Sequence, residues 1–163
     1  MPNAWKIISP TIGFQAIDAT ETSALVPLGT RVRARHATYG EGEFIYLLGV
    51  ASTTANSWVT YNADDHSTTL LAANAIGAVG IAMSANVASS YGWYQIYGKG
   101  IGKALTGYLD NGLVYATATA GSIDDAVVAG AGMDHQRRHR PGALRERPRT
   151  RIGARVRLAR RRR

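Results

Sequence analysis

Glycine recurs at every second position in the stretch GKGIGK, within residues 98–105, which is the part of this sequence most similar to a phosphate-binding loop. A Walker A loop built on these glycines needs another glycine where Tyr97 stands and a serine or threonine where Ala104 stands. A dinucleotide-binding fingerprint needs a glycine where Lys103 stands. Because both patterns fail, we interpret these glycines as spacers between two twisted strands.

Acidic side chains form two small groups with residue types suited to catalysis. Asp64, Asp65 and His66 could bind a metal, and Glu41 and Glu43 are a carboxylate pair of the kind used in glycoside hydrolysis. Adjacent residues on an extended chain do not converge on one point, so we expect a solvated turn at the first group. The two glutamates share a strand face, but the sequence places no other acid beside them, so we expect a turn that leads into the 43–50 strand at the second group. A G-x-S-x-G nucleophile motif is also missing. We therefore predict no catalytic, cofactor-binding or metal-binding residues and no enzyme activity.

Three arginines at alternate positions are the feature of the first 132 residues most suggestive of binding. Arg31, Arg33 and Arg35 fall on one face of an extended chain in the sequence RVRARH. They supply half of the basic residues in this part of the chain. We predict that they form a docking strip for an acidic partner surface. The alternative is a solvated strand face that shields a sheet edge.

Aromatic residues also alternate, with Tyr91, Trp93 and Tyr97 on one face of a predicted strand. Such a stripe could stack nucleic-acid bases or bind a glycan, but only two lysines lie nearby and residues 1–132 are net acidic. Packing in the core or between subunits is the interpretation we favour, since tryptophan and tyrosine are enriched at subunit contacts. The predicted subunit-interface residues are Trp58, Trp93 and Tyr97.

Short runs of apolar and β-branched residues, separated by Gly, Asn and Asp, must position these side chains. Six or seven strands are predicted, at 31–36, 43–50, 57–62, 77–84, 91–97 and 113–119, with 101–108 as the seventh candidate. The nearly continuous apolar run at 43–50 predicts a strand buried on both faces. No long helical period interrupts them, so we predict an all-β fold, a small barrel or sandwich of short strands. The predicted core residues are Phe44, Tyr46, Leu48, Val79, Ile81, Ile96 and Tyr115.

Charge divides the chain into two predicted domains. Residues 1–132 contain six basic and nine acidic residues, a net charge of −3, whereas residues 133–163 contain thirteen arginines and two acids, a net charge of +11. The second part cannot bury enough apolar surface to fold, so we predict a disordered Arg-rich C-terminal tail. The chain has no cysteine and no apolar run of the ~20 residues that a membrane span needs, so no membrane association is predicted.

Three segments of the first domain carry a resemblance to a known family. YGEGEFIYL, YGWYQIYGK and GLVYATATAG are its most specific marks, and the likeness covers roughly residues 12–130. In these segments the chain resembles small head proteins of tailed bacteriophages that are regarded as capsid decoration, or cement, proteins. The resemblance implies an all-β fold, a homotrimer, attachment to the major capsid protein on the outside of an assembled head, and neither catalysis nor a cofactor. It places the protein in the virion, after synthesis in the host cytoplasm.

The tail departs from this family, whose members continue with more mixed, strand-compatible sequence. Residues 133–163 contain no lysine, although arms that contact phosphates commonly use both Lys and Arg. Arg, Pro, Gly and Ala have GC-rich codons, so we interpret the tail as out-of-frame translation of a GC-rich gene. The predicted function is therefore that of a virion structural protein that stabilises a phage capsid. The alternative is a nucleic-acid-binding protein that acts through a genuine Arg-rich arm.

Overall fold

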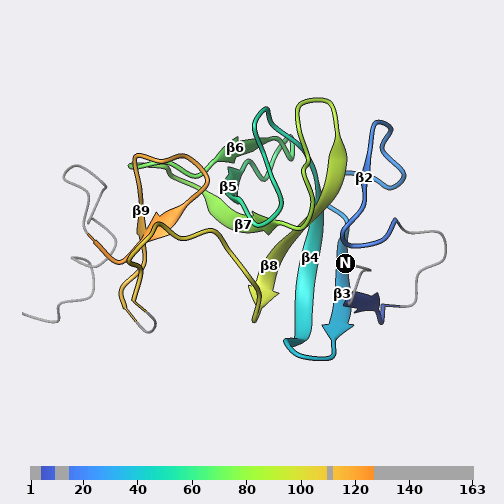
Figure 1. Ribbon diagram of the computed structural model, residues 1–163. Helices are drawn as coiled ribbons and strands as arrows, with labels where there is room; N and C mark the ends of the chain where they lie inside the picture. Colours follow the sequence, from blue (N-terminus) through green and yellow to red (C-terminus); the bar gives the residue numbers. More distant parts are fainter. Residues whose placement is uncertain (1–4, 10–14, 110–111, 127–163) are drawn as a thin grey trace, which may run out of the picture. The chain divides into compact units, whose positions relative to one another are not determined.

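Short antiparallel strands make up the regular structure of this protein, as the computed structural model shows for residues 5–9, 15–109 and 112–126. These residues form ten strands and no helix, which confirms the all-β class (Figure 1). All of them lie within the predicted first domain, and the predicted disordered tail lies outside the described residues. The strands are β1 (Trp5–Ile7), β2 (Thr20–Glu21), β3 (Arg31–His36), β4 (Gly40–Leu48), β5 (Trp58–Tyr61), β6 (Thr68–Leu70), β7 (Ala78–Ala82), β8 (Tyr91–Gly98), β9 (Tyr115–Ala116) and β10 (Ile123–Asp124).

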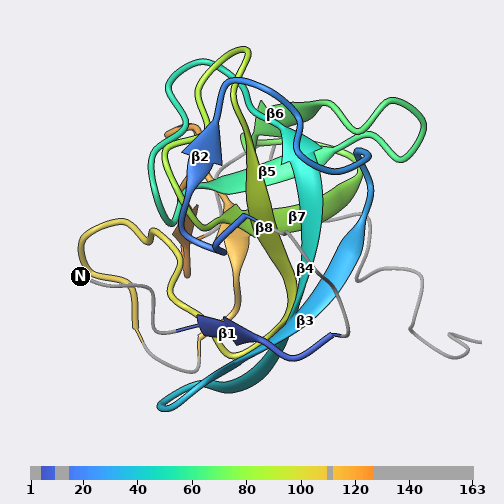
Figure 2. The ribbon, with the colours of Figure 1, turned by 90° about the vertical axis from the view of Figure 1, so that its right-hand side faces the viewer.

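Eight of these strands form one sheet, and part of it bends round on itself. The order is β1-β3-β4-β8-β7-β5-β6, with β2 paired to β8, while β9 and β10 form a separate pair. The Leu48 N–H donates to the His66 carbonyl at 3.2 Å and the Thr68 hydroxyl donates to the Leu48 carbonyl at 2.7 Å. The end of β4 is thereby joined to the start of β6, so β5 and β7 run across β4 and β8 (Figure 2).

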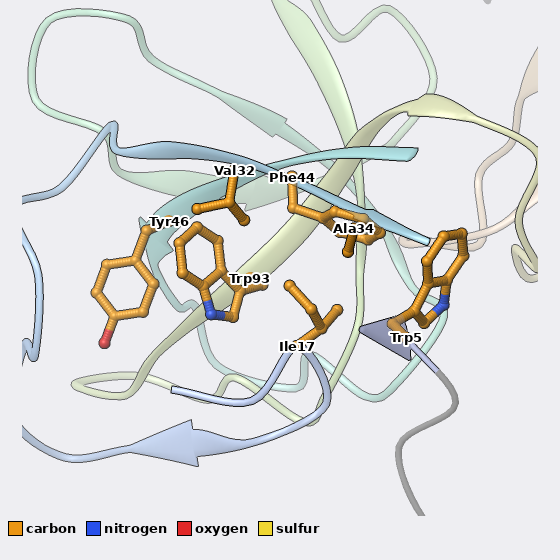
Figure 3. Close-up of a cluster of buried hydrophobic side chains, with 7 residues drawn as sticks. All are labelled: Trp5, Ile17, Val32, Ala34, Phe44, Tyr46 and Trp93. Atoms are coloured by element: carbon orange, nitrogen blue, oxygen red, sulfur yellow. The ribbon is translucent and has the colours of Figure 1, made fainter. Parts of the chain in front are cut away.

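The larger of two apolar cores lies on one face of β3, β4 and β8 (Figure 3). It receives alternate residues of each strand, because successive side chains of a strand point to opposite faces. Gln15 fixes the chain segment that covers it, since its side chain accepts a hydrogen bond from the Tyr46 hydroxyl at 2.9 Å and its carbonyl one from the Trp93 indole at 3.1 Å. The members of this first core are Trp5, Ile17, Val32, Ala34, Phe44, Tyr46 and Trp93.

A second core lies on the opposite face of β4 and β8, under β5 and β7. Its members are Ile45, Leu47, Val59, Ala82 and Tyr94. The β4 strand thus contributes to both cores, which confirms the prediction of a strand buried on both faces. Burial of alternate residues on each side also explains why the apolar run at 43–50 is nearly continuous.

The predicted core is correct at the centre of the sheet and wrong at β7. Phe44 and Tyr46 are fully buried, but Val79 is 40% exposed. The inward positions of β7 are taken by two small residues, Gly80 and Ala82, which are both buried. Larger residues of β7 therefore point outward. The other predicted core residues, Leu48, Ile81, Ile96 and Tyr115, are half-buried.

Candidate binding face of the sheet

Alternation along β3 places its three arginines on the outer side of the sheet. Val32 and Ala34 are buried in the first core, whereas Arg31, Arg33 and Arg35 are exposed. The sequence pattern therefore predicted the orientation of this strand correctly. The same face continues onto the β1 segment, β4 and the end of β8. We call it the outer face, and its residues are Lys6, Ile8, Arg31, Arg33, Arg35, Glu41, Glu43 and Tyr97.

Strand pairing decides which of these side chains are neighbours. Lys6 of β1 and Glu41 of β4 are the direct partners of Arg35 on its two sides. Lys6 adds a fourth cation that the sequence analysis did not assign to the strip. The signal that could have found it is the alternation of Trp5, Lys6 and Ile7, but a strand of three residues is too short to be recognised from its pattern.

One ion pair crosses the outer face. The Arg33 Nε atom lies 3.1 Å from Glu43 Oε1, and the two side chains are 64% and 36% exposed. An exposed pair of this kind contributes roughly 0–1 kcal/mol, so its main effect is to neutralise Arg33 locally. Among the described residues, Lys6, Arg31 and Arg35 form no ion pair, which leaves their charges available to a partner.

A β-bulge in β8 brings Tyr97 onto the outer face. Glu43 pairs with Tyr97 but the next residue of β4, Phe44, pairs with Gln95, so Ile96 is an extra residue in β8. The alternation that we predicted for positions 91 to 97 therefore breaks at Ile96. Tyr97 is 70% exposed and lies beside the Arg33–Glu43 pair, on the face opposite to Gln95.

Trp93 is wrongly predicted as a subunit-interface residue, because its side chain is fully buried within this chain. Its indole N–H donates to the Gln15 carbonyl and its ring packs 5.0 Å from that of Tyr46. Trp58 is half-buried: Gly102 lies directly against its ring, and its indole N–H donates to the Lys103 carbonyl at 3.0 Å. Tyr97 has the exposure that an interface residue needs, and its contact with another copy stays a prediction.

The glycine-rich segment after β8 is used for packing within the chain. The Gln95 amide donates to the carbonyls of Tyr97 and Lys99, at 3.2 and 3.1 Å. The Lys103 ammonium donates to the Thr54 hydroxyl, and the Lys103 main-chain N–H to the Asn56 carbonyl at 2.9 Å. Between β8 and β9 the described residues form only an isolated bridge at Ala104, so the glycines do not lead directly into a second strand as we predicted. They let the backbone pass closely over Gln95 and Trp58.

The acidic group at 64–66 forms an exposed turn. Asp65 accepts hydrogen bonds from the Ser67 hydroxyl at 2.6 Å and the Ser67 N–H at 2.9 Å, and these bonds hold the pKa of the Asp65 carboxyl below its usual value. The described residues contain no group of three or more His, Cys, Asp or Glu side chains that could hold a metal ion. Glu41 and Glu43 lie on β4 itself, and Glu43 is paired to Arg33.

Within the described ranges there is also no helix with the length and apolar character needed to cross a membrane. Comparisons with protein-family models, with curated proteins and with solved structures found no match to this chain. The resemblance to capsid decoration proteins therefore stays a prediction from the three quoted segments. What the structure adds is the composition of the outer face.

Proposed function

We propose that this chain is a virion structural protein that binds the outer surface of a bacteriophage head and stabilises the capsid. The observation that carries the proposal is the outer face. Four of the six basic residues of the net acidic first domain gather there, beside an exposed tyrosine. Arginine and tyrosine are among the residues most enriched at protein–protein contacts.

The proposed mechanism is binding without catalysis. The cations of the outer face, including Arg31, Arg33 and Arg35, attract an acidic region of the major capsid protein, and complementary charge fixes the orientation of the contact. A ligand that binds only the assembled head stabilises it by mass action. A homotrimer, with the exposed part of Trp58 as the candidate contact between copies, adds multivalency. The protein acts in the virion and needs no cofactor.

One feature favours a second candidate function, a nucleic-acid-binding protein. The thirteen arginines of residues 133–163 would bind phosphates if the tail is genuine. That reading assigns no role to the outer face. Binding would then fall steeply with salt and be independent of Arg31 and Arg35.

Co-sedimentation of the full chain with purified, undecorated phage heads tests the first proposal. Saturation at a fixed copy number, at low and at high salt, is the expected result. The Arg31→Glu variant should bind heads severalfold more weakly, because it places a carboxylate where the partner is acidic.

Lys99→Glu is the matched control. It makes the same change of charge at an exposed lysine outside the outer face, and it should bind heads like the unaltered chain. Absence of saturable binding by the unaltered chain contradicts the proposed function. Equal binding by both variants contradicts the role of the outer face.

A further inference from the structure

Charge on the outer face is arranged in rows that cross the strands. In the first row, Lys6 and Glu41 flank Arg35, so two cations and one carboxylate give a formal charge of +1. In the last row, Arg31 is paired across the strands with Ile45, which is buried in the second core, so this row also has a charge of +1.

The row between them has no net charge. Arg33 is neutralised by its ion pair with Glu43. The same row contains Ile8, whose N–H donates to the Arg33 carbonyl, and Tyr97, which pairs with Glu43. Ile8 is 48% and Tyr97 70% exposed, so the row has an uncharged ion pair at its centre and apolar or aromatic surface at its two ends.

We propose that the outer face binds an extended segment of its partner in which two acidic residues, four positions apart, flank a central apolar residue. The inference deepens the proposed function and rests on it only for the identity of the protein that carries this segment. The acidic side chains pair with the Arg31 and Arg35 rows. The apolar side chain lies over the Arg33–Glu43 pair, with Ile8 on one side and Tyr97 on the other.

The spacing of the two cationic rows selects an extended partner. Residues on one face of a strand recur every two positions, and a strand rises about 3.3 Å per residue, so the backbones of Arg31 and Arg35 are about 13 Å apart. An extended segment places residues i and i+4 at the same separation and residue i+2 on the same side. An acid at i+2 would lie over the Arg33–Glu43 pair, which has no net charge, and would gain no attraction there.

Neither a second copy of this chain nor a nucleic acid fits the pattern. No two acidic residues in the sequence are four positions apart, so no strand of another copy supplies the required pair. A phosphate backbone carries charge at regular intervals, and on this face it would meet Glu41 and Glu43 as well as the cations. A peptide with a neutral centre avoids the Glu43 carboxylate.

Titration of the full-length, ¹⁵N-labelled protein with synthetic peptides, followed by NMR, tests the inference. Three seven-residue peptides are isomers, each made of two aspartates, one valine and four threonines. The aspartates are four positions apart around the valine in the first, two apart in the second and adjacent in the third. Because the net charge is equal, attraction to the Arg-rich tail is equal and the isomers differ only in fit. The first should bind roughly two- to fivefold more tightly, with shifts in β1, β3 and Tyr97.

The Glu43→Gln variant removes the carboxylate that neutralises Arg33 in the middle row. It frees Arg33, so the isomer with aspartates two positions apart should gain affinity and the preference for the first isomer should shrink or invert. A destabilised protein would lose affinity for all three peptides equally, so this gain is specific to the proposed arrangement. Arg35→Gln should abolish the preference.

Two results would overturn the inference. One is equal affinity of the three isomers for the unaltered chain. The other is an outer face that does not respond to the peptides, either because the peptide-induced shifts lie elsewhere or because only an oligothymidylate shifts its resonances. Failure of the proposed function is distinguishable from these. If the protein prefers the first peptide but does not bind heads, only the proposed phage partner is contradicted. If it binds heads but shows no preference among the peptides, only the proposed acidic segment is contradicted.

Discussion

The Tyr94 hydroxyl is a buried polar group without a hydrogen-bond partner in the second core. Burial raises the pKa of this phenol above its usual value, and the nearby side chains of Thr68 and Asn86 offset part of the increase. Folding therefore favours the protonated form. The resulting stability is complete below the pKa of an unfolded tyrosine, about 10, and is lost as the pH rises through the folded value.

Replacing Tyr94 with phenylalanine should leave the protein as stable at pH 7 or slightly more stable, because no hydrogen bond is lost. The variant should also lose less stability between pH 9 and 11, since one phenol with a raised pKa is gone. Thermal melts across this pH range measure both effects. Tyr46→Phe is the control: its hydroxyl donates to Gln15, so its loss should cost about 1 kcal/mol at pH 7. A large loss of stability in Tyr94→Phe at pH 7 would show that the hydroxyl is paired in solution.

Two buried strand glycines should respond differently to the addition of a methyl group. A Cβ atom at Gly92 would lie 2.1 Å from the Asn86 side-chain oxygen, which accepts hydrogen bonds from Thr20 and Ser84. We expect Gly92→Ala to destabilise the fold by about 1–3 kcal/mol. At Gly80 the nearest atoms lie 3.4 Å away, an ordinary contact, so Gly80→Ala should change stability little.

Urea unfolding of the two alanine variants gives the comparison directly. The two sites are both buried and both in strands, so a general cost of adding Cβ to a strand would appear in both. If both variants lose the same free energy of unfolding, the Asn86 side chain moves aside, and its contact with Gly92 does not decide which residue can occupy position 92.

At the scale of the element, β1 depends on one side chain. Trp5 packs against the rings of His36 and Phe44, each at 5.0 Å, and is almost fully buried. His36 in turn accepts hydrogen bonds at Nδ1 from the N–H groups of Thr38 and Tyr39, which orders the turn between β3 and β4. A strand of three residues has few other interactions to hold it.

We therefore expect Trp5→Ala to cost about 3–5 kcal/mol and to release β1 from the sheet. Faster hydrogen exchange at the main-chain N–H of Ile8, which bonds to Arg33, would report the release. Lys6→Ala keeps the packing of β1 and removes only an exposed charge, so it should leave exchange unchanged. Protection of Ile8 in Trp5→Ala would show that main-chain pairing alone holds this strand.

Local alternation predicted the elements whose two faces differ most in chemistry. In β3 the arginines and the buried Val32 and Ala34 alternate without interruption, so the outer face was visible in the sequence. In β8 both faces are apolar, and nothing local marks Ile96 as the extra residue of a bulge. The orientation of Tyr97 depends on how β8 pairs with β4, which is a long-range property.

Whole-sheet geometry explains the remaining differences between sequence and structure. Trp93 and Trp58 resemble interface residues by type, but the segment at Gln15 covers one and the segment at Gly102 covers the other. Those coverings come from parts of the chain 78 and 44 positions away in sequence, and no local pattern encodes them. The second core likewise forms only because β5 and β7 cross β4 and β8.

At the scale of the whole molecule, the last prediction follows from the distribution of charge along the chain. The outer face carries four cations and two carboxylates in a domain whose net charge is −3, while residues 133–163 carry +11. A full-length variant with the thirteen tail arginines replaced by glutamine should bind heads with unchanged stoichiometry, because the outer face is intact. The unaltered chain should retain single-stranded DNA and the variant should not, because the arginines that would contact phosphates are gone. For the unaltered chain, each phosphate contact contributes a slope of roughly −0.7 when the logarithm of affinity is plotted against the logarithm of salt concentration. Co-sedimentation and filter binding measure the two properties separately. Loss of head binding in the glutamine variant, with Arg31→Glu unaffected, would assign the function to the tail and favour the nucleic-acid reading.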